Sequence, residues 1–266
     1  MAPEDAPVDA TADRTLALLW RHKLPEPTGS RGPKQKTTVD AVVASGIALA
    51  DDEGLETFSM RKVADRLGIG VMSVYTYVPG REELIGLMID QATGEKPHPA
   101  LEGNLPARLE IVAHHLWDEY GRHPWLLQVD TSRPWLGPNI ADRYEWELSA
   151  VEGSGISDIE MDQVVTLIAG FVASAARSAR DAKRTAERSG LSDEAWWAIN
   201  APLLERVMDG ADYPISGRVG QASGEAYNAA SNPQLAFRFG LARVIDGIVS
   251  FVEASPAHDS GDPRSA

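Results

Sequence analysis

Two short apolar stretches with helical spacing meet across a single glycine, Gly68, and this pattern restricts the fold more than any other in the chain. Ser59 can cap the first stretch with its hydroxyl, and Val63, Ala64 and Leu67 fall on one face of it. Glycine adopts the left-handed backbone conformation at little cost, so it can end the first helix within one residue. The pattern predicts two short helices that cross closely at a tight turn.

The second of these helices is expected over about residues 70–77. Val74 and Val78 lie four positions apart and can seal it onto the first helix. The remaining side chains would then face outward: Val71, Met72, Ser73, Tyr75, Thr76 and Tyr77. Aromatic and hydroxyl groups on one exposed helix face suit the base edges and phosphates of the DNA major groove. The alternative is an ordinary helical hairpin without a role in DNA binding.

Helical spacing of apolar residues continues along the chain, and no stretch shows the alternation of a β-strand, so the expected fold class is all α. Further helices are expected at 13–24, from Thr38 to about residue 50, from Arg81 to about 92, and at 105–121, 138–152, 158–188, 193–209 and 233–253. Ser157 with Glu160 predicts a capping box for the helix at 158–188. Residues 210–232 are rich in glycine and serine and are expected to form a loop.

Composition shifts along the chain predict four parts. Residues 1–36 would be an N-terminal extension with a basic arm, and 37–92 a helix-turn-helix domain with three helices and a connecting fourth. Residues 97–254 would form a larger helical domain for ligand binding and dimerisation, and 255–266 a disordered tail.

The net charge of −14 is unusual for a nucleic-acid binder, but the charge is unevenly distributed. Residues 97–266 carry fourteen basic and twenty-four acidic residues, whereas Arg31, Lys34 and Lys36 have no acidic residue among them. We therefore expect a small basic footprint on an acidic body.

The chain has no cysteine, which excludes disulfides and thiolate metal sites and favours a reducing cytoplasm. No apolar run approaches the roughly 20 residues of a membrane helix, so no membrane partner is expected.

The segment from Ser59 to Leu84 resembles the tetracycline-repressor (TetR) family of transcriptional regulators. The features that carry the resemblance are a helix, Gly68, Val74-Tyr75-x-Tyr77-Val78, and Arg81-Glu-Glu-Leu84 at the start of the next helix. Weaker similarity to the tetracycline repressor's own C-terminal domain lies in Ser132-Arg133-Pro134, in Gly155-Ile156-Ser157 and in the stretch from Phe237 to Gly247. The resemblance covers about residues 38–253.

The resemblance implies roles for individual residues in DNA binding. Met60 and Arg61 would lie near the backbone and the groove edge. Val71, Met72, Ser73 and Tyr75 would meet base edges. Thr76, Tyr77 and Arg81 would reach phosphates, while Arg31, Lys34 and Lys36 would form a flexible arm, with a solvated linker as the alternative.

The resemblance also implies a homodimer held by a four-helix interface, with two helices from each subunit. The interface residues would be Gly170, Ala173, Phe237, Leu241, Val244 and Ile248. Aromatic residues between about 112 and 147 are similar in placement to the ligand pocket of the family, although core packing is the alternative for each. The expected ligand-binding residues are Val112, Leu116, Trp117, Tyr120, Arg133, Trp135, Tyr144, Glu147, Val165 and Phe171. Val112 stands where the tetracycline pocket has an amide.

A metal site and an enzyme are the alternatives to this interpretation. His114, His115, Asp118, Glu119 and His123 include two pairs one helical turn apart, but the pairs point in different directions, so no metal site is expected. No glycine-rich phosphate loop, nucleophile elbow or paired metal motif is present, so we expect neither an enzyme nor a bound cofactor.

The sequence therefore predicts a ligand-responsive, sequence-specific DNA-binding regulator. By the family's usual pattern it would be a repressor, released from a palindromic operator by a small hydrophobic or aromatic effector. The alternative is a DNA-binding regulator or architectural protein without a small-molecule ligand.

Overall fold

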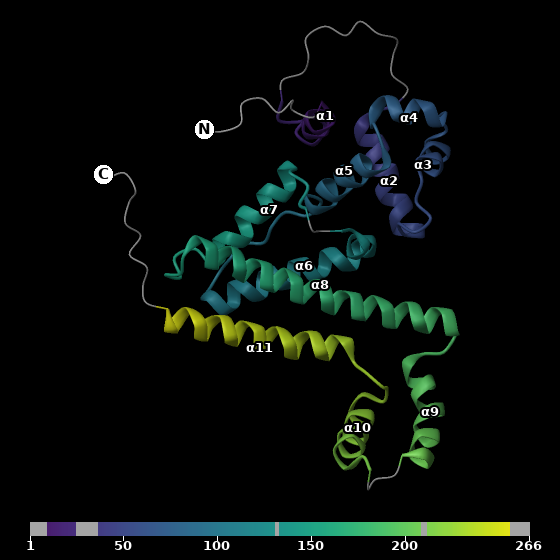
Figure 1. The fold of residues 1–266 in the computed structure, drawn as a ribbon, viewed down its shortest axis with the longest axis vertical. Helices are drawn as coiled ribbons and strands as arrows, with labels where there is room; N and C mark the ends of the chain where they lie inside the picture. Colours follow the sequence, from purple (N-terminus) through teal and green to yellow (C-terminus); the bar gives the residue numbers. More distant parts are fainter. Residues whose placement is uncertain (1–9, 25–36, 131–132, 209–211, 256–266) are drawn as a thin grey trace, which may run out of the picture. The chain divides into compact units, whose positions relative to one another are not determined.

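The computed structural model describes residues 10–24, 37–130, 133–208 and 212–255 (Figure 1). These residues form eleven α-helices, one short 3-10 helix and no strand, which confirms the all-α prediction. The elements are α1 (Ala10–Leu19), α2 (Val39–Glu53), α3 (Met60–Leu67), α4 (Val71–Tyr77), α5 (Arg81–Thr93), α6 (Leu105–Arg122), η1 (Pro124–Gln128), α7 (Pro138–Ser149), α8 (Asp158–Ser189), α9 (Asp193–Val207), α10 (Pro214–Tyr227) and α11 (Pro233–Ala254).

The chain divides into two compact units, Met1–Ser154 and Gly155–Ala266, here called unit 1 and unit 2. The predicted functional boundary near residue 92 therefore lies inside unit 1, and it remains a prediction. The predicted tail lies almost wholly outside the described residues.

Unit 1 is built on a core in which α2 packs against α3, α4 and α5. We call α2 to α4, with the turns that join them, the reading head. Its buried side chains are the apolar ones that helical spacing places on inward faces: Val42, Val43, Val63, Val74, Val78, Leu84 and Met88. The helix α5 continues from the head and also packs against α7 and α1. Burial of these side chains, each worth about 1.5–3 kcal/mol, stabilises such short helices, which would be marginal alone.

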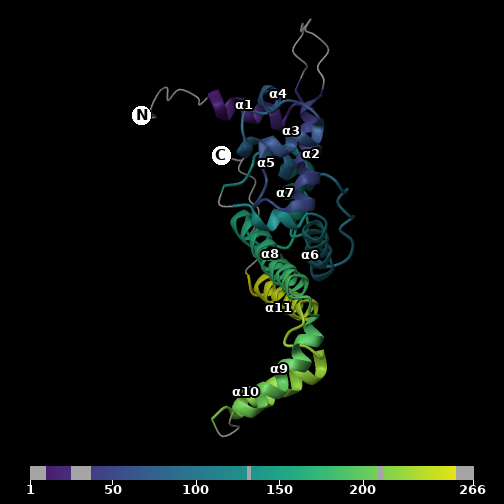
Figure 2. The same ribbon diagram turned by 90° about the vertical axis from the view of Figure 1, so that its right-hand side faces the viewer.

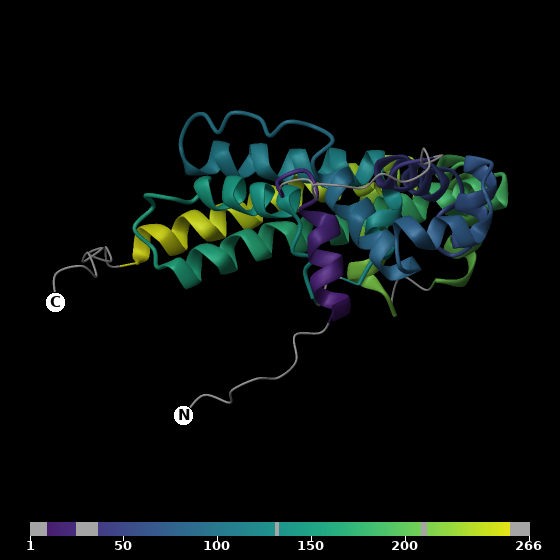
Figure 3. The same ribbon diagram turned by 90° about the horizontal axis from the view of Figure 1, so that it is seen from above.

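Unit 2 contains the long helix α8, which runs beside α11 (Figures 1 and 3). Ser157 and Glu160 form the predicted capping box at its start. In the described part of the chain, α8 is the one helix long and apolar enough to cross a membrane by length and composition alone, which differs from the expectation. The helix is this apolar because several of its residues, among them Ile168 and Val172, are buried in the core of unit 2.

The expected loop at 210–232 is wrong, because its centre forms α10. Pro214 occupies the first helical turn, and Asn228 ends the helix in the left-handed conformation. Gly224 lies so close to the Trp197 ring of α9 that a methyl group there would come within 2.7 Å of it. The glycines that suggested a loop therefore include one that lets two helices pack. Together α9 and α10 extend beyond the ends of α8 and α11 (Figure 2).

Candidate DNA-binding surface and ligand cavity

The turn between α3 and α4 has the geometry that the sequence predicted. The Ser59 hydroxyl accepts a hydrogen bond from the Lys62 N–H at 3.3 Å and caps α3. Gly68 has a φ of 67°, in the left-handed region, and its N–H donates to the Asp65 carbonyl at 3.2 Å. A side chain would strain this conformation, so the close approach of α3 and α4 depends on glycine here.

The outward face of α4 is the candidate surface for reading DNA bases. Val74 and Val78 have no exposed surface and hold α4 on the head, whereas Met72 is 74% exposed. The other exposed residues of this face are Val71, Ser73, Tyr75 and Thr76. The predicted orientation of α4 is thereby confirmed for these residues, while their contacts with bases remain a prediction. The Thr76 hydroxyl donates to the Ser73 carbonyl at 2.6 Å, so it must rotate to donate to a phosphate.

Two residues expected to meet DNA are turned toward the protein instead. Met60 is buried in the core of the head, because the residue that follows the cap begins the inward face of α3. Its side chain cannot reach the groove in the folded head. Tyr77 is half-buried against the same core, so at most part of its side chain is available to a phosphate. Arg61, the neighbour of Met60, is exposed as expected.

The basic footprint of the head is partly neutralised by α2. Lys62 Nζ lies 2.6 Å from Glu53 Oε2, and Arg66 Nη2 lies 2.6 Å from Asp52 Oδ2. Both pairs are exposed, and such pairs contribute about 0–1 kcal/mol, so a DNA phosphate could replace either carboxylate. The sequence alone does not assign these partners, because Glu53 and Asp52 reach Lys62 and Arg66 only when α2 packs against α3. Arg31, Lys34 and Lys36 lie outside the described residues.

Arg81 has a structural role in addition to the one expected. Its Nε donates to the Phe58 carbonyl at 3.4 Å and its Nη2 to the Leu55 carbonyl at 3.2 Å. The guanidinium also lies 5.7 Å from the centre of the Phe58 ring. Arg81 thus ties the start of α5 to the connection between α2 and α3, and a contact with phosphate would have to use its remaining donors.

A cavity of about 150 Å³ lies in unit 1 between α5, α6, α7 and the segment before α7. Its wall includes three of the predicted ligand residues, Tyr120, Arg133 and Trp135. The other wall residues are Ile89, Thr93, Glu119, Leu126, Val129, Asp130, Pro134, Ile140 and Arg143. A more open recess beside it shares Arg133 and Trp135 and extends to Arg81 of α5. This combination of aromatic, aliphatic and a few charged groups suits a small organic ligand.

The remaining predicted ligand residues do not line this cavity. Val112 and Leu116 are fully buried core residues of α6. Trp117 is half-exposed, and Tyr144 is exposed because it is rotated by about 100° around α7 from the cavity residue Arg143. Val165 and Phe171 belong to unit 2, where Val165 is buried and Phe171 stacks on Phe237 with ring centres 6.1 Å apart.

Glu119 and Arg143 of the cavity wall form a charged cluster with the buried Glu147, which does not line the cavity. Arg143 Nη1 donates to Glu119 Oε1 at 2.9 Å, and Arg143 Nε lies 3.5 Å from Glu147 Oε1. Glu119 Oε2 and Glu147 Oε1 have no hydrogen-bond partner among the described residues. Burial raises the pKa of Glu119, and burial raises that of Glu147 to about 7, although Arg143 acts against both shifts.

Sequence reasoning names Glu147, which does not line the cavity, and misses Glu119 and Arg143, which do. It treats Glu119 only as a candidate metal ligand, and 24 positions separate Glu119 from Arg143. Arg143 therefore joins the charged group of the cavity wall, Glu119, to a second buried carboxylate behind it.

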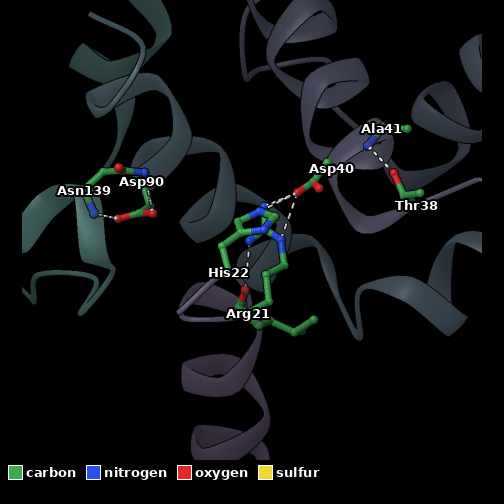
Figure 4. A network of polar contacts seen from close by, with 8 residues as sticks. Arg21, His22, Thr38, Asp40, Ala41, Asp90 and Asn139 are labelled. Atoms are coloured by element: carbon green, nitrogen blue, oxygen red, sulfur yellow. Dashed lines mark hydrogen bonds and ion pairs between the residues drawn. The ribbon is translucent and has the colours of Figure 1, made fainter. Parts of the chain in front are cut away.

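Contacts of α5 connect this cavity to the reading head. The Trp135 ring lies against Gly86 of α5, where any β-carbon would collide with it. One turn later, Asp90 accepts hydrogen bonds from the backbone N–H groups of Asn139 and Ile140 at 2.9 and 3.1 Å and from the Asn139 side chain at 3.0 Å (Figure 4). Burial raises the pKa of Asp90 despite these bonds. The helix that supports the head is therefore joined to the start of α7.

The predicted dimer residues fall into two groups in unit 2. Phe237, Leu241 and Ile248 are already buried within one chain, because α11 uses them to pack on α8. Ala173 and Val244 are half-buried, and a β-carbon at Gly170 would meet nothing within 4 Å. The most exposed apolar side chains of these helices are Ile159, Leu167, Phe239 and Phe251. An unpartnered apolar face on α8 and α11 fits the predicted interface, which remains a prediction.

The residues considered for a metal site have other partners. His115 is buried, its ring 5.3 Å from that of His98 and 5.0 Å from that of Trp146. His123 Nδ1 lies 2.9 Å from Asp51 Oδ1, and its Nε2 lies 3.0 Å from Glu95 Oε2. Within the described ranges, no group of three or more His, Asp or Glu residues is arranged to hold a metal ion.

The sequence is similar to those of known transcriptional repressors. Residues 98–252 match the model of the tetracyclin repressor-like C-terminal domain. The HTH-type transcriptional repressor DrrR1 of Streptomyces coeruleorubidus is 41% identical over 241 residues, which cover 88% of this chain and 84% of that protein. An HTH-type transcriptional regulator of Saccharopolyspora erythraea is 29% identical over 143 residues, covering 52% of this chain and 59% of that protein.

The fold is also similar to that of ActR from Streptomyces coelicolor. Its structure with actinorhodin has a TM-score of 0.66 at 23% identity and covers 85% of this chain and 99% of that one. Three observations point to the same family. The family model matches more than half of the chain, a repressor relative is 41% identical, and α3 and α4 have helix-turn-helix geometry. The chain belongs to the tetracycline-repressor family of helix-turn-helix transcriptional regulators.

Proposed function

We propose that this protein binds a palindromic operator as a homodimer in the cytoplasm and that a small aromatic or hydrophobic effector releases it. The observation that carries the proposal is the outward face of α4, with Val74 and Val78 sealed inside and Met72 and Tyr75 exposed. A helix held in this way can enter the major groove without disturbing the head. The protein would act by binding alone, without a catalytic step.

The cavity of unit 1 supports the effector part of the proposal. Tyr120 and Trp135 offer aromatic surface, and Arg133 and Arg143 offer donors that can orient a ligand. ActR, which shares the fold, is solved in complex with actinorhodin and with (S)-DNPA. We expect the effector here to contact the Trp135 ring.

Linkage between the cavity and DNA would run through α5. Two recognition helices must lie about 34–36 Å apart to enter successive major grooves. A ligand that displaces Trp135 from Gly86 changes the packing of α5 and, with it, the position of the head. The ligand can shift the equilibrium only by the difference between its affinities for the two arrangements.

Footprinting on the region upstream of the protein's own gene, with selection from random duplexes, tests DNA binding. We expect protection of one palindromic site and an affinity that falls steeply with salt, because phosphate contacts release counterions. Failure to protect or select any discrete site at moderate salt would contradict the proposal.

The second candidate function is a DNA-binding protein without an effector. Thermal-shift measurements with aromatic compounds, beginning with actinorhodin, distinguish the two. A ligand at a hundredfold excess over its Kd adds about 2.7 kcal/mol to the free energy of unfolding. Stabilisation that disappears in Trp135→Leu, together with release of DNA, supports an effector. Absence of any shift across a broad panel favours the second candidate.

A further inference from the structure

The N-terminal helix α1 belongs to the folded part of unit 1, although it precedes the reading head in sequence. It packs against α5, and Leu19 at its end is buried in the same core as Leu84 and Met88. The DNA-binding surface and the cavity described above use none of its residues. The residues that follow it contact Leu136, the neighbour of the cavity residue Trp135, and Asp40 of the reading head.

Two consecutive residues after α1 make polar contacts with different parts of unit 1. The Trp20 Nε1–H donates to the Leu136 carbonyl at 2.7 Å. Arg21 donates to Asp40 Oδ1 from Nε at 2.9 Å and from Nη2 at 2.5 Å (Figure 4). Arg21 Nη1 also donates to the Leu18 carbonyl at 2.8 Å, which fixes the guanidinium on the end of α1.

The Asp40 carboxylate, which is 52% exposed, is the group of α2 that this arginine contacts. His22 Nε2 lies 3.1 Å from the same oxygen. Burial acts to raise the pKa of Asp40, but the hydrogen bonds and charges of Arg21 and His22 outweigh it and hold that pKa below its ordinary value. Asp40 therefore stays ionised at neutral pH and keeps its ion pair with Arg21.

The other end of α2 is held separately. Asp51 Oδ1 accepts hydrogen bonds from the Trp125 Nε1–H at 2.9 Å and pairs with His123 Nδ1 at 2.9 Å. Asp40 and Asp51 are eleven positions apart in α2, which is about 16 Å along the helix axis. A helix attached near one end can pivot, whereas a helix attached at both ends cannot change its angle without breaking a contact.

The segment that Trp20 holds is part of the cavity wall. Leu136 follows Trp135, whose ring lines the cavity and lies against Gly86 of α5. The contacts of α1 thus join the cavity wall to the N-terminal end of α2.

We propose that α1 is a strap that sets the angle of the reading head, with Trp20 and Arg21 as positioning residues for DNA recognition. The inference rests on the proposed function, because the angle matters only if two heads must meet successive major grooves. Without the strap, α2 would keep Val42 and Val43 in the core with α5 but would lose the polar attachment near its N-terminal end. It would then tilt about its Asp51 end and carry α3 and α4 with it.

The dependence of affinity on half-site spacing reports how freely the two heads can move. One added base pair moves a half-site by about 3.4 Å and rotates it by about 34° around the DNA axis. A fixed pair of heads tolerates this poorly, while heads that pivot can follow the displaced site. Loss of a DNA contact or of stability would instead weaken binding at every spacing alike.

The experiment uses the full chain and the palindrome found by footprinting, with spacers changed by −1, 0, +1 and +2 base pairs at one salt concentration. The test variant combines Trp20→Phe, which removes only the indole N–H donor, with Arg21→Gln. Lys183→Gln makes the same charge change at an exposed position of α8 and is the control. Circular dichroism and thermal unfolding identify any variant that fails to fold, and Arg21→Lys, which retains the charge, is the milder second variant.

We expect the wild type and Lys183→Gln to bind at least about tenfold more weakly when one base pair is added. The double variant should reduce this penalty to less than about threefold, with Arg21→Lys intermediate. An unchanged penalty in a folded double variant would overturn the strap, and so would a uniform loss of affinity at all spacings. If the wild type binds no duplex at all, the proposed function itself fails, and the strap fails with it.

Discussion

Replacement of Glu147 by glutamine should raise the free energy of unfolding relative to the wild type, and this difference should grow as the pH rises. Glu147 is buried beside Arg143 and Glu119, and burial raises its pKa from the ordinary 4.5 to about 7. Because the folded-state pKa is the higher one, the native protein binds this proton more tightly than the unfolded chain. The contribution to stability is fully present below about pH 4.5 and is lost as the pH rises toward about 7.

The magnitude follows from the size of the shift. One pKa unit corresponds to about 1.36 kcal/mol, so the ionised carboxylate costs the native state about 3 kcal/mol at about pH 8 and less than about 1 kcal/mol at about pH 5. Glutamine has nearly the same shape and carries no charge. The free energy of unfolding of Glu147→Gln, relative to the wild type, should therefore rise by about 2 kcal/mol between these two pH values.

Urea unfolding at a series of pH values, followed by circular dichroism, measures this difference. Glu145→Gln makes the same charge change at an exposed position of α7 and should show a flat difference. A flat difference for Glu147→Gln would show that the carboxylate does not have a raised pKa. A difference that falls with pH would show that the pairing with Arg143 outweighs burial.

Three further predictions concern the head, the interface and the buried histidines. Tyr75→Ala should weaken operator binding and leave folding intact, whereas Val74→Asp should unfold the head, because it buries an unpaired charge. Circular dichroism with gel-shift titration tests both variants, and the reverse result would show that the register of α4 is wrong. Ala173→Arg should dissociate the dimer and abolish operator binding, since two-fold symmetry repeats the buried charge. Analytical ultracentrifugation tests this, and a dimeric variant with normal binding would show that this face of α8 is not the dimer interface. Burial is the first cause that lowers the pKa values of His98 and His115, so the unfolded chain takes up protons that the native state excludes, and the free energy of unfolding should fall as the pH drops below about 6.5. His115→Phe should reduce this loss, which acid unfolding measures, and an unchanged loss would show that His115 is not its source.

Local patterns were enough to predict most helices and the orientation of α4. Ser59, Gly68, Val74 and Val78 act within a few residues of one another, through a cap, a left-handed turn and helical spacing, so their roles can be read from the chain. The same reasoning failed for 210–232, where glycines suggested a loop. There the contact between Gly224 and Trp197, 27 positions away, supports a helix.

The candidate site depended more on tertiary structure. The sequence predicted Tyr120, Arg133 and Trp135 as ligand residues, and they do line one cavity. It also assigned Met60 to DNA, although the helix directs that side chain into the core. Exposed and buried positions near a helix end differ by a single residue, and spacing alone does not separate them.

An all-α chain with a helix-turn-helix could be predicted from the residues alone, because caps, turns and apolar periodicity are local properties. The packing of the helices was needed to show which charges share a buried volume and what α1 contacts. Arg143 meets Glu119 across 24 positions, Arg21 meets Asp40 across 19, and Trp20 meets Leu136 across 116. Such pairs form when separate helices pack, and hydrogen bonds or raised pKa values then follow from burial, which no spacing along the chain encodes.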